Sequence, residues 1–220
     1  MIIRAVLFDL DGTLIDSLED LTDAVNHIRS AFCHPPLTSD IVRLKVGKGA
    51  RNLVQQVLPG ITEADLDRAL ALFLKFNKQH IADKSRLYPG ITQMLHNLAA
   101  NGIQMAIVSN KNEDLSRLTL ETFGIANLFQ LICGGDTYPE RKPSPLPLLQ
   151  VSNQLGLAPK ECLMIGDSCN DIEAGQRAGI VSIGCLWGYG SAEELASADD
   201  LVHTPQELLA AITARFSARS

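Results

Sequence analysis

The sequence lacks the features that mark several classes of protein. Its five cysteines are scattered, with no C-x-x-C pair and no cysteine–histidine spacing of a zinc site. An odd number of cysteines without such a framework argues for free thiols in a reducing compartment, so we expect a cytoplasmic protein. The five histidines show no pairing either, and we assign none of them a role.

Positive charge and long apolar runs are also scarce. The formal net charge is −6 at pH 7, which argues against nucleic acid as a partner. The apolar run near the N-terminus stops at Phe8 and acids follow it, so it is too short for a signal peptide or a membrane span. We therefore expect no membrane partner, and a protein that is a monomer or a homodimer.

Apolar residues are nevertheless frequent enough for a sizeable core. The chain has 220 residues, of which 46% are hydrophobic. From residue 88 onwards, short apolar runs alternate with segments of helical period, many of which stop at a glycine. This alternation predicts an α/β fold with a Rossmann-like parallel sheet and helices on both of its faces.

A block of helices interrupts this pattern after the first strand. The segment from 17 to 86 has helical periodicity throughout. Ser17 and Asp20 have the spacing of a capping box at the start of its first helix. A helical insert at this place predicts a cap that closes over the sheet. We therefore expect two domains, an α/β core of residues 1–15 and 87–220 and an α-helical cap of residues 16–86.

Polar residues gather where each predicted strand ends. In chain order they are Asp9 and Asp11, then Ser109, then Lys142 in the loop after the third strand, then Asp167 and Asp171. In an open α/β sheet, ligands bind at the carboxyl ends of the strands. If the strands are parallel and adjacent, these four groups meet at one edge of the sheet.

This set of side chains suits the transfer of a phosphoryl group. Asp9 and Asp167 offer two of the few carboxylates that Mg²⁺ prefers. Asp9 can also act as an in-line nucleophile, and Asp11 can protonate the leaving alkoxide. Ser109 can hydrogen-bond the phosphoryl oxygens, and Lys142 supplies the positive charge that the transition state needs.

Each of these residues also has an ordinary structural explanation. Asp9 and Asp11 can simply form a turn after the strand. Asp171 can cap the following helix rather than join a metal site. Arg141 stands directly beside Lys142 and is the alternative cation for the phosphate.

The four groups, in this order, resemble the four motifs of the haloacid dehalogenase-like hydrolase superfamily over nearly the whole chain. The matching stretches are Asp9-Leu10-Asp11-Gly12-Thr13, Ser109, Lys142 and Gly166-Asp167-Ser168-x-x-Asp171. The resemblance implies a phosphatase in which Asp9 is the nucleophile and Asp11 the acid and base. It also implies that Ser109 and Lys142 bind the phosphate. A Mg²⁺ cofactor would be held by Asp9, the backbone carbonyl of Asp11, and Asp167.

Other stretches resemble the phosphoglycolate phosphatases within that superfamily. They are Val46-Gly47-Lys48-Gly49-Ala50, Ser109-Asn110-Lys111, Gly134-Gly135-Asp136, Lys142-Pro143-Ser144-Pro145 and Gly188-Tyr189-Gly190. This resemblance implies a small phosphorylated metabolite as substrate, 2-phosphoglycolate, and a role in carbohydrate metabolism. Asn110 joins Ser109 in the expected substrate site. Lys48 and Arg51 can meet a carboxylate at the other end of the substrate, or they are solvated charges.

Other functions stay open at this point. A β-phosphoglucomutase-like mutase, or another phosphosugar or nucleotide phosphatase, would use the same residues. A haloacid dehalogenase would use Asp9 without a metal, which the further carboxylates of Asp11 and Asp167 disfavour. A small-molecule binding module would keep these residues without turnover.

Overall fold

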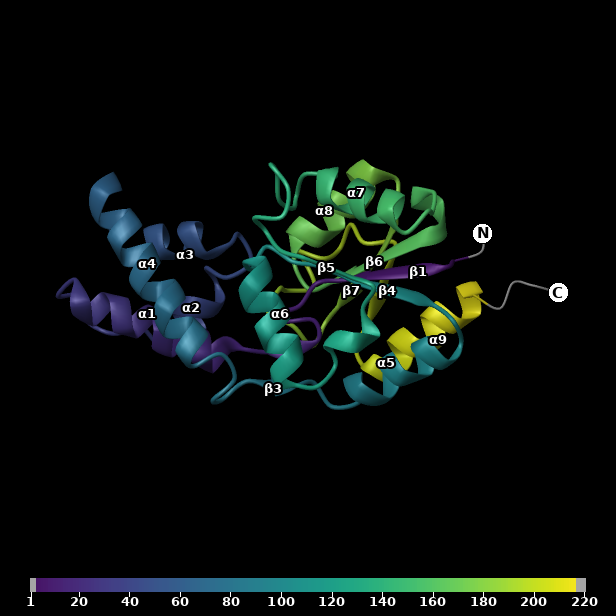
Figure 1. The fold of residues 1–220 in the computed structure, drawn as a ribbon, viewed down its shortest axis with the longest axis horizontal. Coiled ribbons are helices and arrows are strands. Elements are labelled where there is room, and N and C mark those ends of the chain that lie inside the picture. Colours follow the sequence, from purple (N-terminus) through teal and green to yellow (C-terminus); the bar gives the residue numbers. More distant parts are fainter. Residues whose placement is uncertain (1–2, 217–220) are drawn as a thin grey trace.

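A computed structural model of the chain describes residues 3–216, in which the central element is a six-stranded sheet (Figure 1). The strands are β1 (Ala5–Phe8), β4 (Gln104–Val108), β5 (Leu131–Cys133), β6 (Cys162–Gly166), β7 (Val181–Cys185) and β8 (Asp200–Val202). Their order is β5-β4-β1-β6-β7-β8, and each neighbouring pair is parallel. The predicted α/β fold is confirmed. β1 lies between β4 and β6 in the sheet.

Helices cover both faces of this sheet, with α7 and α8 above it and α5 and α9 below it in Figure 1. One face carries α5 (Ile91–Ala100), α6 (Glu113–Thr122) and α9 (Pro205–Phe216), and the other carries α7 (Leu146–Gln154) and α8 (Cys169–Ala178). Short helices η1 (Ala126–Leu128) and η2 (Pro159–Glu161) precede β5 and β6. Residues of β1 alternate between the faces, so that Phe8 packs on the first group and Leu7 on the second. Because both faces are covered, the strand is apolar throughout.

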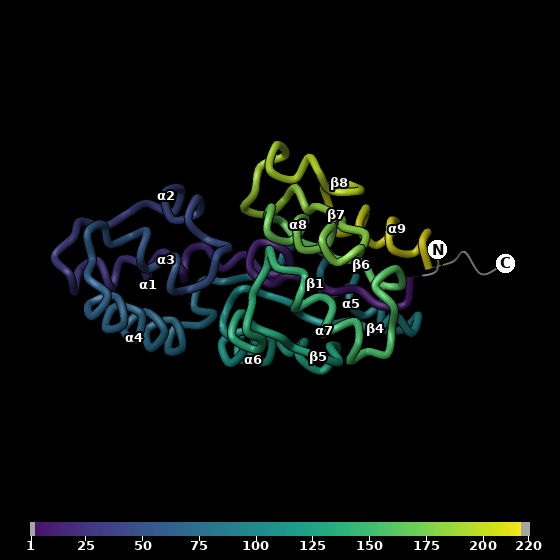
Figure 2. Tube along the Cα trace, turned by 90° about the horizontal axis from the view of Figure 1, so that it is seen from above, coloured from purple at the N-terminus to yellow at the C-terminus, as the bar shows by residue number. Residues whose placement is uncertain are grey.

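Helices α1 to α4 pack mainly on one another. They are α1 (Leu18–Ala31), α2 (Ser39–Arg43), α3 (Ala50–Val57) and α4 (Glu63–Gln79), and we call them the cap helices. Their buried side chains, among them Val25, Val54 and Phe73, form an apolar cluster of their own. Both views place the cap helices at one end of the molecule and α9 at the other (Figure 2). The domain limits at residues 16 and 86 remain a prediction.

Two short strands join the cap helices to the sheet. β2 (Ile15–Asp16) and β3 (Arg86–Leu87) pair antiparallel, with Asp16 opposite Arg86. The chain therefore enters and leaves the cap helices at neighbouring points. Strands of two residues carry too little alternation to be predicted from a sequence pattern. Among residues 3–216, no helix has the length and apolar character needed to cross a membrane.

Within residues 3–216, the capping box expected at Ser17 and Asp20 is absent, although α1 begins where that pattern predicts. The Ser17 hydroxyl donates instead to Asp11 Oδ1 at 2.6 Å. The Asp20 carboxylate accepts from the backbone N–H groups of Lys84 and Ser85 at 3.0 and 2.8 Å. That prediction was wrong because both side chains bind partners outside their own helix, at the end of β1 and just before β3.

Candidate active site

The chain turns sharply after β1, and the turn closes against the loop that follows β6. Gly12 has a φ of +86°, and a Cβ atom there would collide with the Asp167 carboxylate, so only glycine fits. The next residue, Thr13, is buried, and its hydroxyl donates to Asp167 Oδ1 at 2.8 Å. The turn thereby brings the first and fourth groups of polar residues together.

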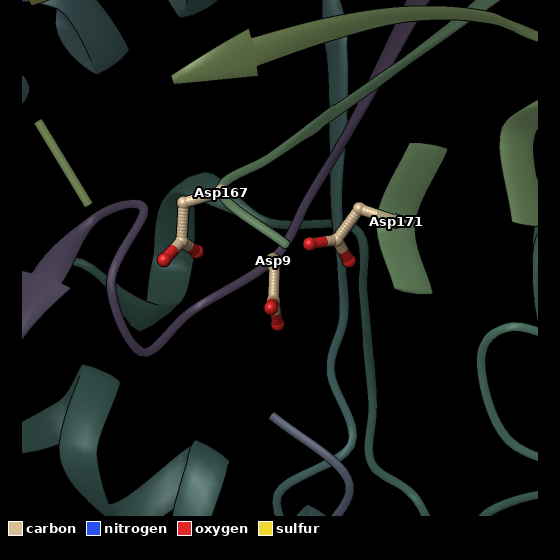
Figure 3. Close-up of side chains that lie close together, drawn as sticks. All are labelled: Asp9, Asp167 and Asp171. Atoms are coloured by element: carbon tan, nitrogen blue, oxygen red, sulfur yellow. The ribbon is translucent and has the colours of Figure 1, made fainter. Parts of the chain in front are cut away.

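Carboxylates from three places in the chain meet at this edge of the sheet. Figure 3 shows Asp167 and Asp171 on either side of Asp9. Each of the three offers an oxygen within 4.8 Å of the others, and all three residues are buried. They come from the end of β1, the end of β6 and the first turn of α8. A buried set of carboxylate oxygens is the donor set of a hard divalent cation.

The negative charge of these acids exceeds what the protein balances. Burial raises the pKa of Asp9 to about 6, although Lys142 acts in the opposite direction. Burial, together with the neighbouring charges of Asp9 and Asp171, raises the pKa of Asp167 to about 8. A carboxyl group with a pKa of about 8, as for Asp167, stays largely protonated at neutral pH unless a cation joins it. The residues present therefore fit a divalent metal.

Lys142 is the buried cation of the site. Its Nζ lies 2.6 Å from Asp171 Oδ1 and 3.2 Å from Asp9 Oδ1. Burial works to lower the pKa of Lys142, but the two carboxylates outweigh it, and the pKa is raised. Arg141, the alternative, is exposed and directs its Nη1 to the carbonyl oxygen of Lys48. The structure thus places Lys142, and not its neighbour, beside the acids.

The loop after β4 brings Ser109 and Asn110 to the same edge. Ser109 is buried and lines a cavity there together with Asp9. Asn110 also borders the cavity, but its Nδ2 donates to the carbonyl oxygens of Gly47 and Lys142 at 2.9 and 2.8 Å. Its amide nitrogen is therefore occupied in tying the cap helices to the loop of Lys142.

Lys111 is a site residue to which sequence reasoning assigned no role. Its Nζ lies 3.1 Å from both oxygens of Asp11, and its side chain is only 7% exposed. With the Ser17 hydroxyl on Oδ1, it holds the Asp11 carboxylate at the start of the cap helices. The available signal was a lysine directly after Ser109-Asn110, but its partner lies 100 residues away in the chain.

The loop of Tyr189 also joins the site, and again its partners were not predictable. The Tyr189 backbone N–H donates to Asp167 Oδ2 at 2.7 Å, and its hydroxyl accepts from the Ser17 N–H at 2.8 Å. Arg43, at the end of α2, donates to the carbonyl oxygens of Gly188 and Tyr189 at 2.5 and 3.0 Å. This loop therefore connects the cap helices to the acids.

The two cap cations expected to meet the substrate lie in different surroundings. Lys48 is exposed and lines the cavity. Arg51 instead pairs with Glu63 at 2.5 Å and with Asp67 at 2.6 Å, both on α4. It is not among the described residues that line the cavity. The structure does not bring Arg51 to the site, because the acidic beginning of α4 binds its guanidinium.

A cavity of about 220 Å³ lies between the cap helices and the carboxyl edge of the sheet. The polar lining on the sheet side includes Asp9, Asp11, Ser109, Lys111 and Asp167. The lining from the cap helices is largely apolar and includes Leu21, Leu53 and Phe73. The reactive groups are thus on the sheet, and the cap helices shape the space for the rest of a substrate.

Known proteins resemble this chain in sequence and in fold. A family model described as haloacid dehalogenase-like hydrolase matches residues 6–185. A phosphoglycolate phosphatase from Chromobacterium violaceum is 39% identical over 211 residues, which cover 94% of this chain and 95% of that protein. One from Neisseria gonorrhoeae is 39% identical over 215 residues, covering 96% and 90%. A crystal structure from Haemophilus somnus, described as a predicted phosphoglycolate phosphatase, is 32% identical with a TM-score of 0.90, covering 95% and 97%. The chain therefore belongs to the haloacid dehalogenase-like hydrolase family.

Proposed function

We propose that this protein is a Mg²⁺-dependent phosphatase that hydrolyses 2-phosphoglycolate through an aspartyl-phosphate on Asp9. The observation that carries the proposal is the cluster of buried carboxylates around Lys142 at the end of β1, which faces a small cavity. The relatives named phosphoglycolate phosphatase support the choice of substrate.

Asp9 is the proposed nucleophile. Its Oδ1 accepts from the Leu10 N–H at 2.7 Å and lies 3.2 Å from Lys142 Nζ, so both contacts favour the ionised form. The same ammonium group can neutralise charge on the phosphoryl oxygens as the reaction proceeds. The Ser109 hydroxyl, in the loop directly after β4, is the proposed donor to a phosphoryl oxygen.

Asp11 is the proposed acid and base. As the bond from Asp9 to phosphorus forms, the ester bond breaks, and Asp11 donates its proton to the leaving alkoxide. A water molecule then attacks the aspartyl-phosphate while Asp11 takes a proton from it, which releases inorganic phosphate and restores both acids. Lys111 and Ser17 position the Asp11 carboxylate before the substrate arrives.

The proposed ligands of Mg²⁺ are the carboxylates of Asp9 and Asp167 and the backbone carbonyl of Asp11. When bound, Mg²⁺ supplies positive charge that offsets the acids and the phosphoryl group. Asp171 has a different proposed role, because its Oδ1 accepts from Lys142 at 2.6 Å and its Oδ2 from the Ser168 N–H at 3.0 Å. It holds the buried lysine in place and caps α8.

The cavity favours a small anionic ester. Its volume of about 220 Å³ is below the roughly 300–1,000 Å³ of pockets for drug-sized ligands. Lys48 lines it from the loop before α3 and is the proposed contact for a carboxylate on the leaving group. Because the free cysteines argue for a reducing compartment, we also propose that the enzyme acts in the cytoplasm.

A panel of phosphate esters, assayed with Mg²⁺ for phosphate release, tests the proposal. We expect the highest kcat/KM for 2-phosphoglycolate, with one phosphate released for each substrate consumed. Consumption of a phosphosugar without phosphate release would indicate a mutase. Turnover of 2-haloacids in the presence of chelator would indicate a dehalogenase, and no turnover of any ester would indicate a binding module.

A further inference from the structure

Asn77 is a buried amide in the apolar wall that the cap helices give the cavity. It lies in the last turn of α4, is 3% exposed and lines the cavity beside Phe73 and Leu53. Its backbone carbonyl accepts from the His80 N–H, whereas its side chain has no hydrogen-bond partner within residues 3–216. A buried amide among apolar side chains is unfavourable unless a partner satisfies it.

The amide of Asn77 borders the cavity rather than being enclosed by protein. Within the described residues, the unpaired polar side-chain atoms that are wholly enclosed are Asn110 Oδ1 and Ser116 Oγ. The Asn77 amide is not one of them, although the residue as a whole is buried. Its unpaired atoms are therefore not wholly enclosed by protein, and the residue lines the cavity.

Asn77 differs in this respect from the other polar side chains that the cap helices and their loops place on the cavity. Arg43 already donates to two backbone carbonyl oxygens at 2.5 and 3.0 Å. Lys48 is exposed, so water can satisfy its ammonium group. Asn77 therefore combines burial, a position on the cavity and free hydrogen-bonding capacity, which together point to a ligand.

We propose that Asn77 is a specificity-determining residue that hydrogen-bonds a carboxylate or hydroxyl oxygen of the leaving group. The proposal rests on the function proposed above, in which the phosphoryl group lies at Asp9 on the sheet side and the leaving group faces the cap helices. A carboxamide donates through Nδ2 to a carboxylate or hydroxyl oxygen, and accepts through Oδ1 from a hydroxyl. The ligand class is a short phosphate ester whose leaving group carries a carboxylate or hydroxyl. An alkyl or aryl leaving group would leave the amide unpaired.

Three variants test this role. Asn77→Leu keeps the size of the side chain and suits its apolar surroundings, and Asn77→Ala is a smaller second variant if the first does not fold. Asn77→Asp replaces the donor by an acceptor of negative charge. Asn52→Leu is the matched control, because Asn52 lies on α3 and is not among the described residues that line the cavity. Thermal unfolding checks that each variant is folded.

The measurement is kcat/KM for esters whose leaving group does or does not carry a further carboxylate or hydroxyl group. Asn77→Leu should lower it roughly 10- to 100-fold for 2-phosphoglycolate and glycerol 3-phosphate, and less than about threefold for ethyl and phenyl phosphate. Asn77→Asp should lower it further for 2-phosphoglycolate, because the two carboxylates repel each other. Asn52→Leu should change none of these values by more than about twofold.

The outcomes separate this proposal from the proposed function. Equal losses of kcat/KM on all four esters would overturn the role of Asn77 while leaving the proposed phosphatase activity in place. No loss on 2-phosphoglycolate and glycerol 3-phosphate would do the same. If the unaltered enzyme does not hydrolyse 2-phosphoglycolate, the proposed substrate is wrong. The comparison of glycerol 3-phosphate with ethyl phosphate then still decides the role of Asn77. If it hydrolyses no ester, both proposals are overturned.

Discussion

Replacing Lys142 by methionine would show how far the buried acids depend on one cation. The lysine side chain is 1% exposed, and its Nζ lies 2.6 Å from Asp171 and 3.2 Å from Asp9. Removing one partner of a buried ion pair leaves charge without compensation and destabilises a protein by about 3–5 kcal/mol. For a chain of this length, about 1 kcal/mol shifts Tm by about 2–4 °C, so Lys142→Met should lower Tm by roughly 6–20 °C.

Calorimetric unfolding in chelator, at pH 7.5 and at pH 5.5, measures this effect. Lowering the pH protonates Asp9, whose pKa is already raised to about 6, so the loss in Tm should shrink at the lower pH. The matched control is Lys142→Met combined with Asp171→Asn, which removes one buried charge together with its partner. It should recover about half of the lost stability while turnover stays lost. A Tm within about 2 °C of the unaltered protein at pH 7.5, or a loss that does not change with pH, would refute the reasoning.

Three further predictions concern the nucleophile, the metal and the substrate. Asp9→Asn should remove more than about 99% of turnover while circular dichroism and Tm show a folded protein. Residual activity above about 1% would contradict covalent catalysis through Asp9. Because the folded pKa of Asp167 is raised to about 8, above that of an unfolded carboxyl group, the metal-free protein should lose stability as the pH rises from about 4 to about 8. Mg²⁺ affinity should rise over the same range as protons leave, and titration calorimetry at pH 6, 7 and 8 that finds a constant Kd would exclude this. Lys48→Ala should raise KM for 2-phosphoglycolate by about tenfold without changing KM for phenyl phosphate. Arg51→Ala is the control and should change neither, and equal effects of Lys48→Ala on the two esters would remove Lys48 from the substrate site.

The parallel strands and the meeting of the acids at their ends follow from local features of the sequence. Each group of polar residues directly follows an apolar run, and parallel strands place those ends at one edge. Ser109 and Asp167 therefore could be placed beside Asp9 without any knowledge of side-chain contacts. The helices between β2 and β3 were predictable for a similar reason, since helical periodicity is a property of neighbouring residues.

Side-chain partners were harder to predict, because they come from distant parts of the chain. Asp20 matches a local capping pattern, yet it binds the backbone of Ser85, 65 residues further on. Arg51 has the charge and position of a substrate contact, but the acids of α4 compete for it. Asn77 looks like any polar residue of an amphipathic helix until packing shows which side of α4 faces the cavity.

The ribbon of β2 and β3 has a consequence for how such proteins diversify. Asp16 and Arg86 face each other across one antiparallel pair, so the two ends of the insert are as close as the two ends of a hairpin turn. A segment of almost any length can be exchanged between these ends without breaking a hydrogen bond of the main sheet. We expect recombination at this point to change the surface that meets the leaving group, while the reaction also requires the new segment to keep the Ser17 contact with Asp11.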